Sequence, residues 1–239
     1  EIFRKMFELN LFKEIKSCEM DILKTIEYDH LNDYDNLDYI PENCFAGCKK
    51  LSEFEISSKV TEIHDNAFCR CKILNKVIIP SSVKSIGKGA FSYSKSFTDL
   101  SVPSSVETLG SSAFYKCISL KDVKLNGNFN SIPDYCFTLC YSLETISIPS
   151  IIQIGDHSFG YCISLKQISF PDKFESIGNY AFEECHNLTS FSLPSSIISI
   201  GEGFILGCDS FEKIEIPDTN NLYSTKDGVL YSKDQNSII

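Results

Sequence analysis

The sequence has no tryptophan, only two methionines and four histidines, and fewer basic than acidic side chains. With 22 Lys and Arg against 32 Asp and Glu, its formal net charge at pH 7 is −10. Proteins that bind a phosphate backbone do so through clustered basic side chains, which release the counterions of the nucleic acid. The charge balance therefore argues against a nucleic-acid ligand.

Long apolar runs are also missing, since the longest are short stretches such as residues 77–79. A membrane-spanning helix needs roughly 20 consecutive apolar residues, so we expect no membrane insertion within this segment. The 11 cysteines include no Cys-x-x-Cys pair, and the histidines stand at unrelated places in the chain. These patterns predict no metal site, no cofactor and no enzyme active site.

A phenylalanine recurs every 23 residues, with one step of 22. The column consists of Phe45, Phe68, Phe91, Phe114, Phe137, Phe159 and Phe182, and Ile205 continues it. Three residues later stand Cys48, Cys71, Ser94, Cys117, Cys140, Cys162, Cys185 and Cys208. Self-similarity at a fixed period of this length is the signature of a solenoid, in which each repeat packs on its neighbours.

Four further columns share the period. Apolar residues stand nine and eleven positions after the phenylalanine, as at Leu100 and Val102, and this i, i+2 spacing predicts a strand. Proline then ends most strands, and a glycine such as Gly87 marks a corner before the next Ala-Phe-x-x-Cys segment. Phe and Cys at i, i+3 would both be buried by one turn of α or 3₁₀ helix, so a short helical turn is predicted there.

The unit Ile-Gly-x-x-Ala-Phe-x-x-Cys-x-x-Leu-x-x-Ile-x-Ile-Pro-x-x-Val resembles the BspA-like, or Treponema pallidum-type, class of leucine-rich repeats. Residues 86–103 match it best, and the resemblance covers about residues 37–217. It implies an α/β solenoid, a right-handed superhelix of about eight coils of 22–23 residues, each with a short strand and a short helical turn. Asn126 and Pro133 depart from the pattern at turn positions, which affects the corners rather than the fold.

The flanks do not follow the repeat, and three regions result: 1–36, 37–217 and 218–239. The first carries an i, i+4 apolar stripe from Phe3 to Ile15, which predicts an amphipathic helix that caps the core or, alternatively, binds a partner. The last contains Asp227-Gly228 before an alternating run, which predicts a C-terminal hairpin. We expect the natural chain to continue beyond it.

The cysteine column allows several interpretations. Equivalent side chains in stacked coils lie about 4.8 Å apart, farther than the roughly 3.8 Å between the Cβ atoms of a disulfide. We therefore favour buried, reduced thiols whose S–H groups bond to nearby carbonyls. Disulfides involving Cys44 and Cys48, or Cys69 and Cys71, remain the alternative, and zinc is disfavoured.

Between the buried strand positions, outward-facing residues form two rows that we call the strand-face rows. The first row is Glu55, Ile78, Ser101, Lys124, Ser147, Ser169, Ser192 and Glu215. The second is Glu53, Lys76, Asp99, Asp122, Thr145, Gln167, Ser190 and Lys213. They form either a solvated surface or a shallow interface for an extended protein or glycan. A second candidate surface is the tyrosine set Tyr93, Tyr115, Tyr135, Tyr161 and Tyr180.

The family resemblance implies a non-enzymatic recognition module. It would belong to a microbial or protist protein, at the cell surface or secreted, that adheres to host extracellular-matrix proteins or to other cells. The alternative is a cytoplasmic scaffold for protein–protein interaction, which the reduced-thiol interpretation favours.

Overall fold

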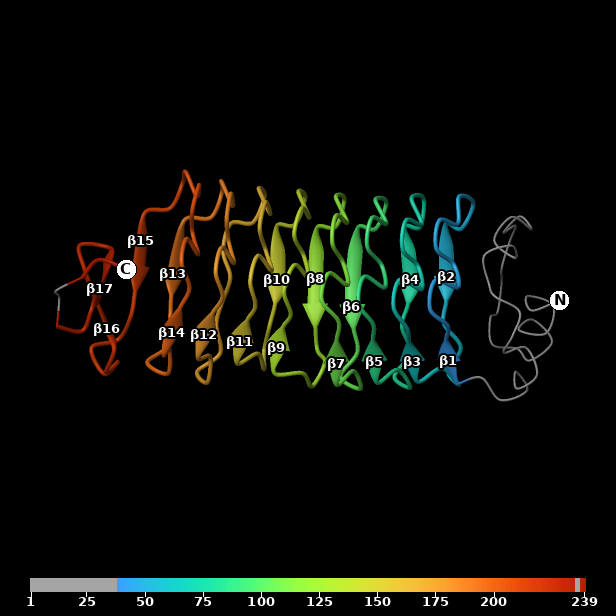
Figure 1. Ribbon diagram of the computed structural model, residues 1–239, viewed down its shortest axis with the longest axis horizontal. Coiled ribbons are helices and arrows are strands. Elements are labelled where there is room, and N and C mark those ends of the chain that lie inside the picture. The colour runs from blue at the N-terminus through green and yellow to red at the C-terminus, as the bar shows by residue number, and fades with distance from the viewer. Residues whose placement is uncertain (1–37, 235–236) are drawn as a thin grey trace.

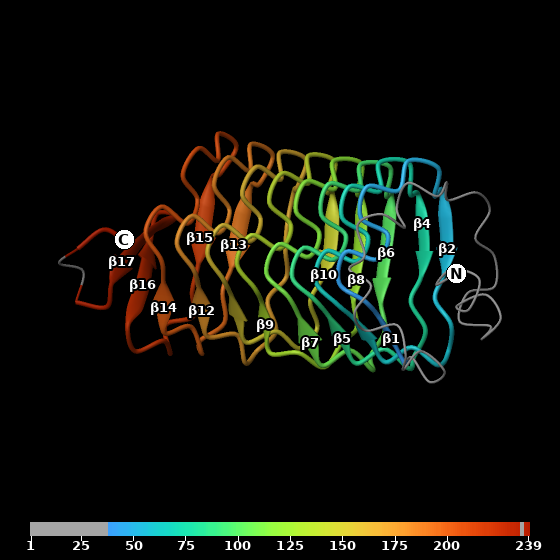
Figure 2. The ribbon, with the colours of Figure 1, turned by 45° about the vertical axis from the view of Figure 1, so that its right-hand side comes forward.

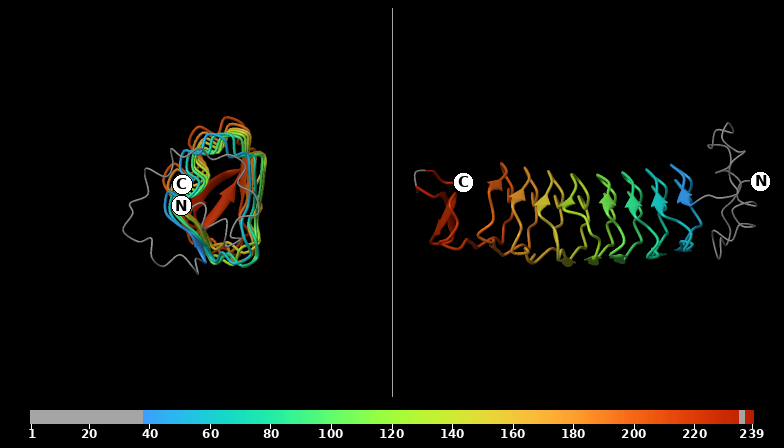
Figure 3. Two further views of the ribbon diagram at one scale, coloured as in Figure 1. Left: turned by 90° about the vertical axis from the view of Figure 1, so that its right-hand side faces the viewer. Right: turned by 90° about the horizontal axis from the view of Figure 1, so that it is seen from below.

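The computed structural model describes residues 38–234 and 237–239, which form one elongated solenoid of stacked coils (Figure 1). Each coil contributes strands on two sides, joined by turns, and successive coils superimpose when viewed along the axis (Figure 3). The apolar side chains of all coils form one continuous core inside the stack. The architecture is the one expected of repeats that can bury their apolar faces only against one another.

The longer strands lie along one side of the solenoid (Figure 2). They are β2 (Glu53–Glu55), β4 (Lys76–Ile78), β6 (Asp99–Val102), β8 (Asp122–Leu125), β10 (Thr145–Ser147), β13 (Ser190–Ser192) and β15 (Lys213–Glu215). Pairing is parallel, β2 with β4, β8 with β6 and β10, and β13 with β15. Residues one period apart face each other, as Leu100 faces Val123, so every side chain stacks on its counterpart.

Two-residue strands run along a second side. The first four, β1 (Tyr39–Ile40), β3 (Glu62–Ile63), β5 (Ser85–Ile86) and β7 (Thr108–Leu109), form one parallel sheet. The next four, β9 (Ser131–Ile132), β11 (Gln153–Ile154), β12 (Ser176–Ile177) and β14 (Ser199–Ile200), form another. The break between β7 and β9 follows the corner where Asn126 replaces proline and where Gly127 lies against the ring of Phe129.

The Ala-Phe-x-x-Cys segments are not helical, so the prediction of an α/β solenoid with a helical turn in each coil is wrong. Residues 38–234 and 237–239 contain no helix. The molecule is a β-solenoid, and the predicted helical cap lies outside the described residues.

Backbone conformation explains the difference. Each of these turn segments has two residues with positive φ, as at Asn66 (54°) and Arg70 (61°), and a right-handed helix excludes such angles. The N–H groups of Cys69 and Cys71 donate to carbonyls three residues earlier, as in β-turns. The intervening N–H groups of Phe68 and Arg70 donate to the next coil, each at 2.7 Å. The segment is therefore a run of turns and also a rung of an intercoil ladder.

The phenylalanine column forms a continuous stack of rings inside the turn segments. Neighbouring ring centroids from Phe45 to Phe182 lie 5.0–5.6 Å apart, with interplanar angles of 14° or less. In the last coil, Phe204 stands at the alanine position and Ile205 at the phenylalanine position. The hydrogen bond from Phe182 N–H to the Phe204 carbonyl, at 2.8 Å, identifies this register, since phenylalanines such as Phe45 donate to the alanine of the next coil. Exchanging the large and small side chains keeps the column filled.

The corner glycines are required by close packing between coils. A Cβ atom added at Gly110 would lie 2.4 Å from the carbonyl carbon of Gly87, and one at Gly201 would lie 2.4 Å from that of Gly178. No positive φ is involved at these positions. The glycines therefore permit backbone approach, not an unusual turn.

The antiparallel hairpin of β16 (Tyr223–Lys226) and β17 (Val229–Ser232) lies where the sequence predicted one. Its two turn residues, Asp227 and Gly228, both have positive φ, as type I′ turns require. Viewed along the axis, the hairpin crosses the end of the stack (Figure 3). Ile214 N–H donates to the Gly228 carbonyl at 3.2 Å and Leu230 is buried, so the hairpin covers the last coil.

Asn220 joins the hairpin to the last coil. Only 2% of this residue is exposed, and its amide donates to the carbonyls of Ser195 and Ile197 at 2.9 and 2.8 Å. Its carbonyl oxygen accepts the N–H groups of Leu222 and Tyr223 at 2.8 and 2.7 Å. All the hydrogen-bonding capacity of the amide is thus used, as a buried polar side chain requires.

Replacing Asn220 by leucine should lower the free energy of unfolding by about 2–4 kcal/mol, because four hydrogen bonds worth about 1 kcal/mol each are lost. Urea unfolding followed by circular dichroism measures the change. Alanine at the neighbouring exposed Asn221 is the matched control and should shift stability by less than about 0.5 kcal/mol. Equal effects of the two substitutions would refute the capping role.

Candidate functional site

The strand-face rows lie on the side formed by the longer strands, and their side chains point outward. All of them are exposed except Ser190, which is half-buried. Buried and exposed residues alternate, as in β6, where Leu100 and Val102 are buried while Asp99 and Ser101 are exposed. The period-2 pattern read from the sequence therefore placed these residues on one face.

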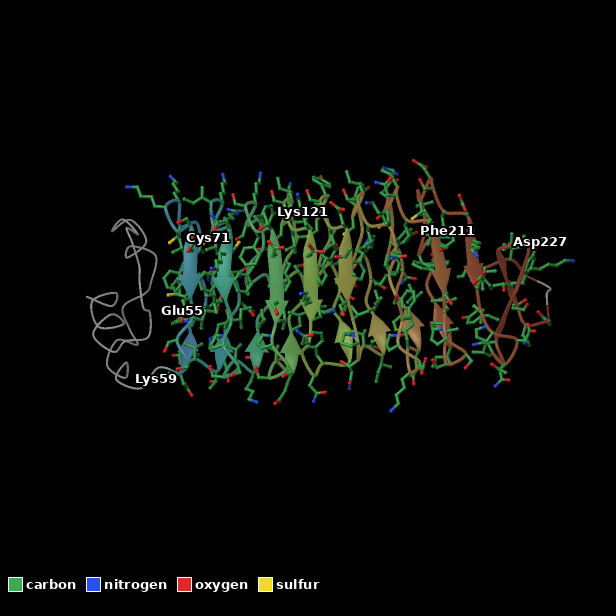
Figure 4. The ribbon with its side chains drawn as sticks, turned by 180° about the vertical axis from the view of Figure 1, so that it is seen from behind. Glu55, Lys59, Cys71, Lys121, Phe211 and Asp227 are labelled. Carbon is green, nitrogen blue, oxygen red and sulfur yellow. The ribbon has the colours of Figure 1, made fainter. Side chains whose placement is uncertain are left out.

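A third exposed row, not recognised in the sequence, borders the other two. It consists of Ser52, Asn75, Thr98, Lys121, Glu144, Lys166, Thr189 and Glu212, one residue before the second row. Lys121 marks it near the top of the stack in Figure 4, where Glu55 marks the first row. Counting seven residues from each phenylalanine would have identified the row, because it keeps the same period.

Polar contacts on this face are local and involve few residues. Thr145 Oγ1 donates to Asp122 Oδ1 across neighbouring coils. Lys166 Nζ lies 3.5 Å from Glu144 Oε2, and Lys213 Nζ lies 2.8 Å from Glu215 Oε1. The exposed Glu215 carboxylate raises the pKa of Lys213. In the first two rows, the six residues of the fifth to seventh coils are uncharged: Thr145, Ser147, Gln167, Ser169, Ser190 and Ser192.

The face is neither uniform nor deeply hollowed. Residues 165–171 are not in strand conformation, which separates β10 from β13. In that coil the rings of Phe170 and Phe174 lie 4.6 Å apart, and Phe170 fills a place that aliphatic side chains take in the other coils. At the N-terminal end, a hollow of about 350 Å³ lies beside Ile78, which is 46% exposed. The arrangement suits a broad, shallow contact.

The cysteine column proves to be part of the core. The thiol of Cys71 donates to the carbonyl of Phe45 at 3.0 Å, and the hydroxyl of Ser94 donates to that of Phe68 at the same distance. Cys117, Cys140, Cys162, Cys185 and Cys208 repeat the bond at 3.1–3.3 Å. Each phenylalanine carbonyl also accepts a turn N–H, so both of its lone pairs are used.

The fully buried thiols of this column are poor nucleophiles, whereas the half-buried Cys208 has its pKa lowered by its hydrogen bond with Cys185. Burial raises the pKa of Cys117 to about 12 and also raises the pKa values of Cys136, Cys140 and Cys162. A reactive cysteine needs the opposite, a depressed pKa in an electropositive environment. Cys69 and Cys71 are free thiols, so the disulfide alternative is wrong for that pair.

The tyrosine set is divided between different columns and does not form one surface. Tyr135 and Tyr180 stack on either side of His157, with ring centroids 5.0 and 5.1 Å from it. Tyr93 instead contacts Tyr115 at 5.3 Å, edge to face. The tyrosines stand at different distances from the phenylalanine of their coil. Tyr135, His157 and Tyr180 share one column, two residues before the phenylalanine, and therefore stack on one another.

Within residues 38–234 and 237–239, no group of three or more His, Cys, Asp or Glu side chains is arranged to hold a metal ion. That part of the chain also lacks a helix long and apolar enough to cross a membrane.

The stacked coils and the outward polar face define a repeat protein of the solenoid class. The family model for the BspA type leucine rich repeat region (6 copies) matches residues 38–153 and 130–239, and the chain belongs to this family.

Solved structures agree with this assignment. A leucine-rich repeat protein from Eubacterium ventriosum is 28% identical, with a TM-score of 0.64 over 68% of this chain and 44% of its own. A leucine-rich repeat protein from Bacteroides ovatus is 26% identical, with a TM-score of 0.59, and the match covers 71% of this chain and 50% of that protein. The chain thus spans half or less of the length of these relatives. No curated protein matched it.

The thiol column predicts a graded response at one position. Serine at Cys140 can form the bond that Ser94 forms, so we expect a loss of about 1 kcal/mol. Arginine there would bury an unpaired charge and should cost more than about 4 kcal/mol. Urea unfolding distinguishes the two, and an arginine variant as stable as the parent would refute the register.

Stability should also fall at alkaline pH. The pKa of Cys117 is raised from 9.0 to about 12, so unfolding releases its proton between these values. The stabilisation that the buried, protonated thiol gives the folded state is complete below pH 9. Above that pH it is lost by about 1.4 kcal/mol per pH unit. Urea unfolding from pH 8 to 11 should show a shallower decline for Cys117→Ser than for the parent. Parallel curves would contradict the buried-thiol assignment.

Proposed function

We propose that this chain is a protein-recognition module whose ligand lies along the strand-face rows. The observation that carries the proposal is that the residues of each row, one period apart, face outward over all eight coils and are polar everywhere except at Ile78. Solenoids use such extended surfaces for binding, and leucine-rich repeats generally act as binding scaffolds and not as enzymes. The serine-rich stretch of the fifth to seventh coils, without a deep pocket, favours an extended ligand over a small molecule.

The family supports a more specific role. We propose that the module belongs to a microbial or protist protein, at the cell surface or secreted, and that it mediates adhesion to extracellular-matrix proteins or glycans. The alternative is an intracellular scaffold, and the free thiols favour it, because disulfides are usual in oxidising compartments.

A triple variant tests the strand face. Lys124→Glu with Ser147→Trp and Ser169→Trp adds charge repulsion and bulk at the centre of the rows, and should weaken binding at least about tenfold. Surface plasmon resonance with immobilised fibronectin, laminin and collagen as probes measures the effect.

The matched control carries the same changes at exposed corner positions, Lys88→Glu with Ser81→Trp and Ser104→Trp. It should bind like the parent. Equal losses in both variants, or undiminished binding by the strand-face variant, would count against this surface and direct attention to the Tyr135–His157–Tyr180 stack.

A further inference from the structure

The turn segments carry a polarised distribution of charge that the strand-face proposal does not use. The first four, residues 45–50, 68–73, 91–96 and 114–119, contain six Lys or Arg and no Asp or Glu. The last two, 182–187 and 205–210, contain three Asp or Glu and no Lys or Arg. The chain as a whole is acidic, so this basic end is a local feature.

The intercoil ladder aligns the basic residues. The backbone N–H of Arg70 donates to the carbonyl of Ser92 in the next coil, at 2.7 Å. In the same way Tyr93 N–H donates to the Tyr115 carbonyl and Lys116 N–H to the Thr138 carbonyl, at 2.7 and 2.8 Å. Arg70, Tyr93 and Lys116 therefore occupy one column, with Lys49, Lys72 and Lys95 in the column two residues later. We call the five basic residues Lys49, Arg70, Lys72, Lys95 and Lys116 the basic turn edge.

An aromatic ring organises two of these charges. The Arg70 guanidinium lies 5.5 Å and the Lys116 ammonium 5.6 Å from the centroid of the Tyr93 ring. The contact holds both side chains along the edge, since cations are attracted to the ring face at this distance. Lys49, Arg70 and Lys72 are exposed, and Lys95 and Lys116 are half-buried.

The basic turn edge lacks carboxylate partners within the described part of the chain. Within residues 38–234 and 237–239, lysine ion pairs are formed by Lys84, Lys166 and Lys213, and none of these lysines belongs to the basic turn edge. Coils lie about 4.8 Å apart, so the five charges repel one another over roughly 15 Å. An anionic ligand would relieve this repulsion.

The carboxylates at the acidic end of the same edge lie close to histidine rings. His157 Nδ1 lies 3.2 Å from Glu183, and His186 lies 3.5 Å from Glu184 and 3.1 Å from Asp209. These contacts are ion pairs only when the histidines are protonated, so a second copy of the chain is one of the outcomes that the test below distinguishes.

A peptide strand would also find few partners here. Four consecutive N–H groups of each of the first four turn segments, such as those of residues 68–71, bond within the coil or to the next coil, and these segments contain no strand to which a peptide could add. Recognition must come from side-chain charge. We propose that the basic turn edge binds a linear sulfated polysaccharide running along the solenoid axis, on a surface separate from the strand-face rows.

Fluorescein-labelled heparin is the probe, and its fluorescence anisotropy at physiological salt gives the affinity. Lys49→Ser, Lys72→Ser and Lys95→Ser together should weaken binding about tenfold. The matched control, Lys59→Ser, Lys88→Ser and Lys173→Ser, removes the same three charges from exposed positions elsewhere and should change binding less than about twofold. Desulfated heparin should fail to compete.

Other outcomes would overturn the proposal. These are no binding of heparin by the parent, or equal weakening by the two triple variants. Competition by poly-glutamate as strong as by heparin would assign the edge to an acidic protein. A concentration-dependent dimer that the Lys49, Lys72 and Lys95 variant abolishes would assign it to a second copy. The strand-face triple variant should retain heparin binding, which separates this proposal from the previous one.

Discussion

Hydrogen bonding between neighbouring turn segments is the interaction on which the rest of this structure depends. Alternate N–H groups, such as those of Phe68 and Arg70, reach the next coil while their neighbours close turns within their own coil. The pattern fixes the separation and register of the coils. It also explains why each turn needs two positive φ angles, since these rotate successive N–H groups toward different acceptors.

Once the register is fixed, every residue lies on its counterpart one period away, so each column must tolerate stacking on itself. Phenylalanine rings stack, serine replaces cysteine at Ser94 with its hydrogen bond intact, and glycine recurs where backbones approach within contact distance. Charges are the exception, because like charges in one column repel. Like charges do recur in neighbouring coils, at Asp99 and Asp122 and at the basic turn edge, and the longer series at the basic turn edge carries an electrostatic cost that a structural role does not explain.

The two proposed surfaces differ in kind. The strand-face rows are broad, and they are uncharged from the fifth to the seventh coil, which suits many weak contacts with an extended partner. The basic turn edge is narrow and charged, and it suits a polyanion in an otherwise acidic protein. A module with both could hold a protein ligand on one side and a matrix polysaccharide on another, which would increase avidity if the two ligands were linked.

The columns of the solenoid could be read from the sequence, because side chains that stack on themselves must recur with the coil. Counting from each phenylalanine placed the strand-face rows outward, and the buried thiols were predicted to bond to nearby carbonyls, whereas the equivalent bond of Ser94 became visible only in the structure. The hairpin was predicted from Asp227-Gly228, since this dipeptide is suited to two positive φ angles.

Only the tertiary structure decided the backbone of the turn segments. A phenylalanine and cysteine three residues apart fit a helical turn equally well by spacing, and positive φ at Arg70 or Tyr135 leaves no mark in the residue type. Asn66, Gly89 and Gly203, at the first of the two positions, were the available signal. Local spacing could not reveal the conformation, because bonds to residues more than twenty positions away select it, and those bonds exist only in the stack.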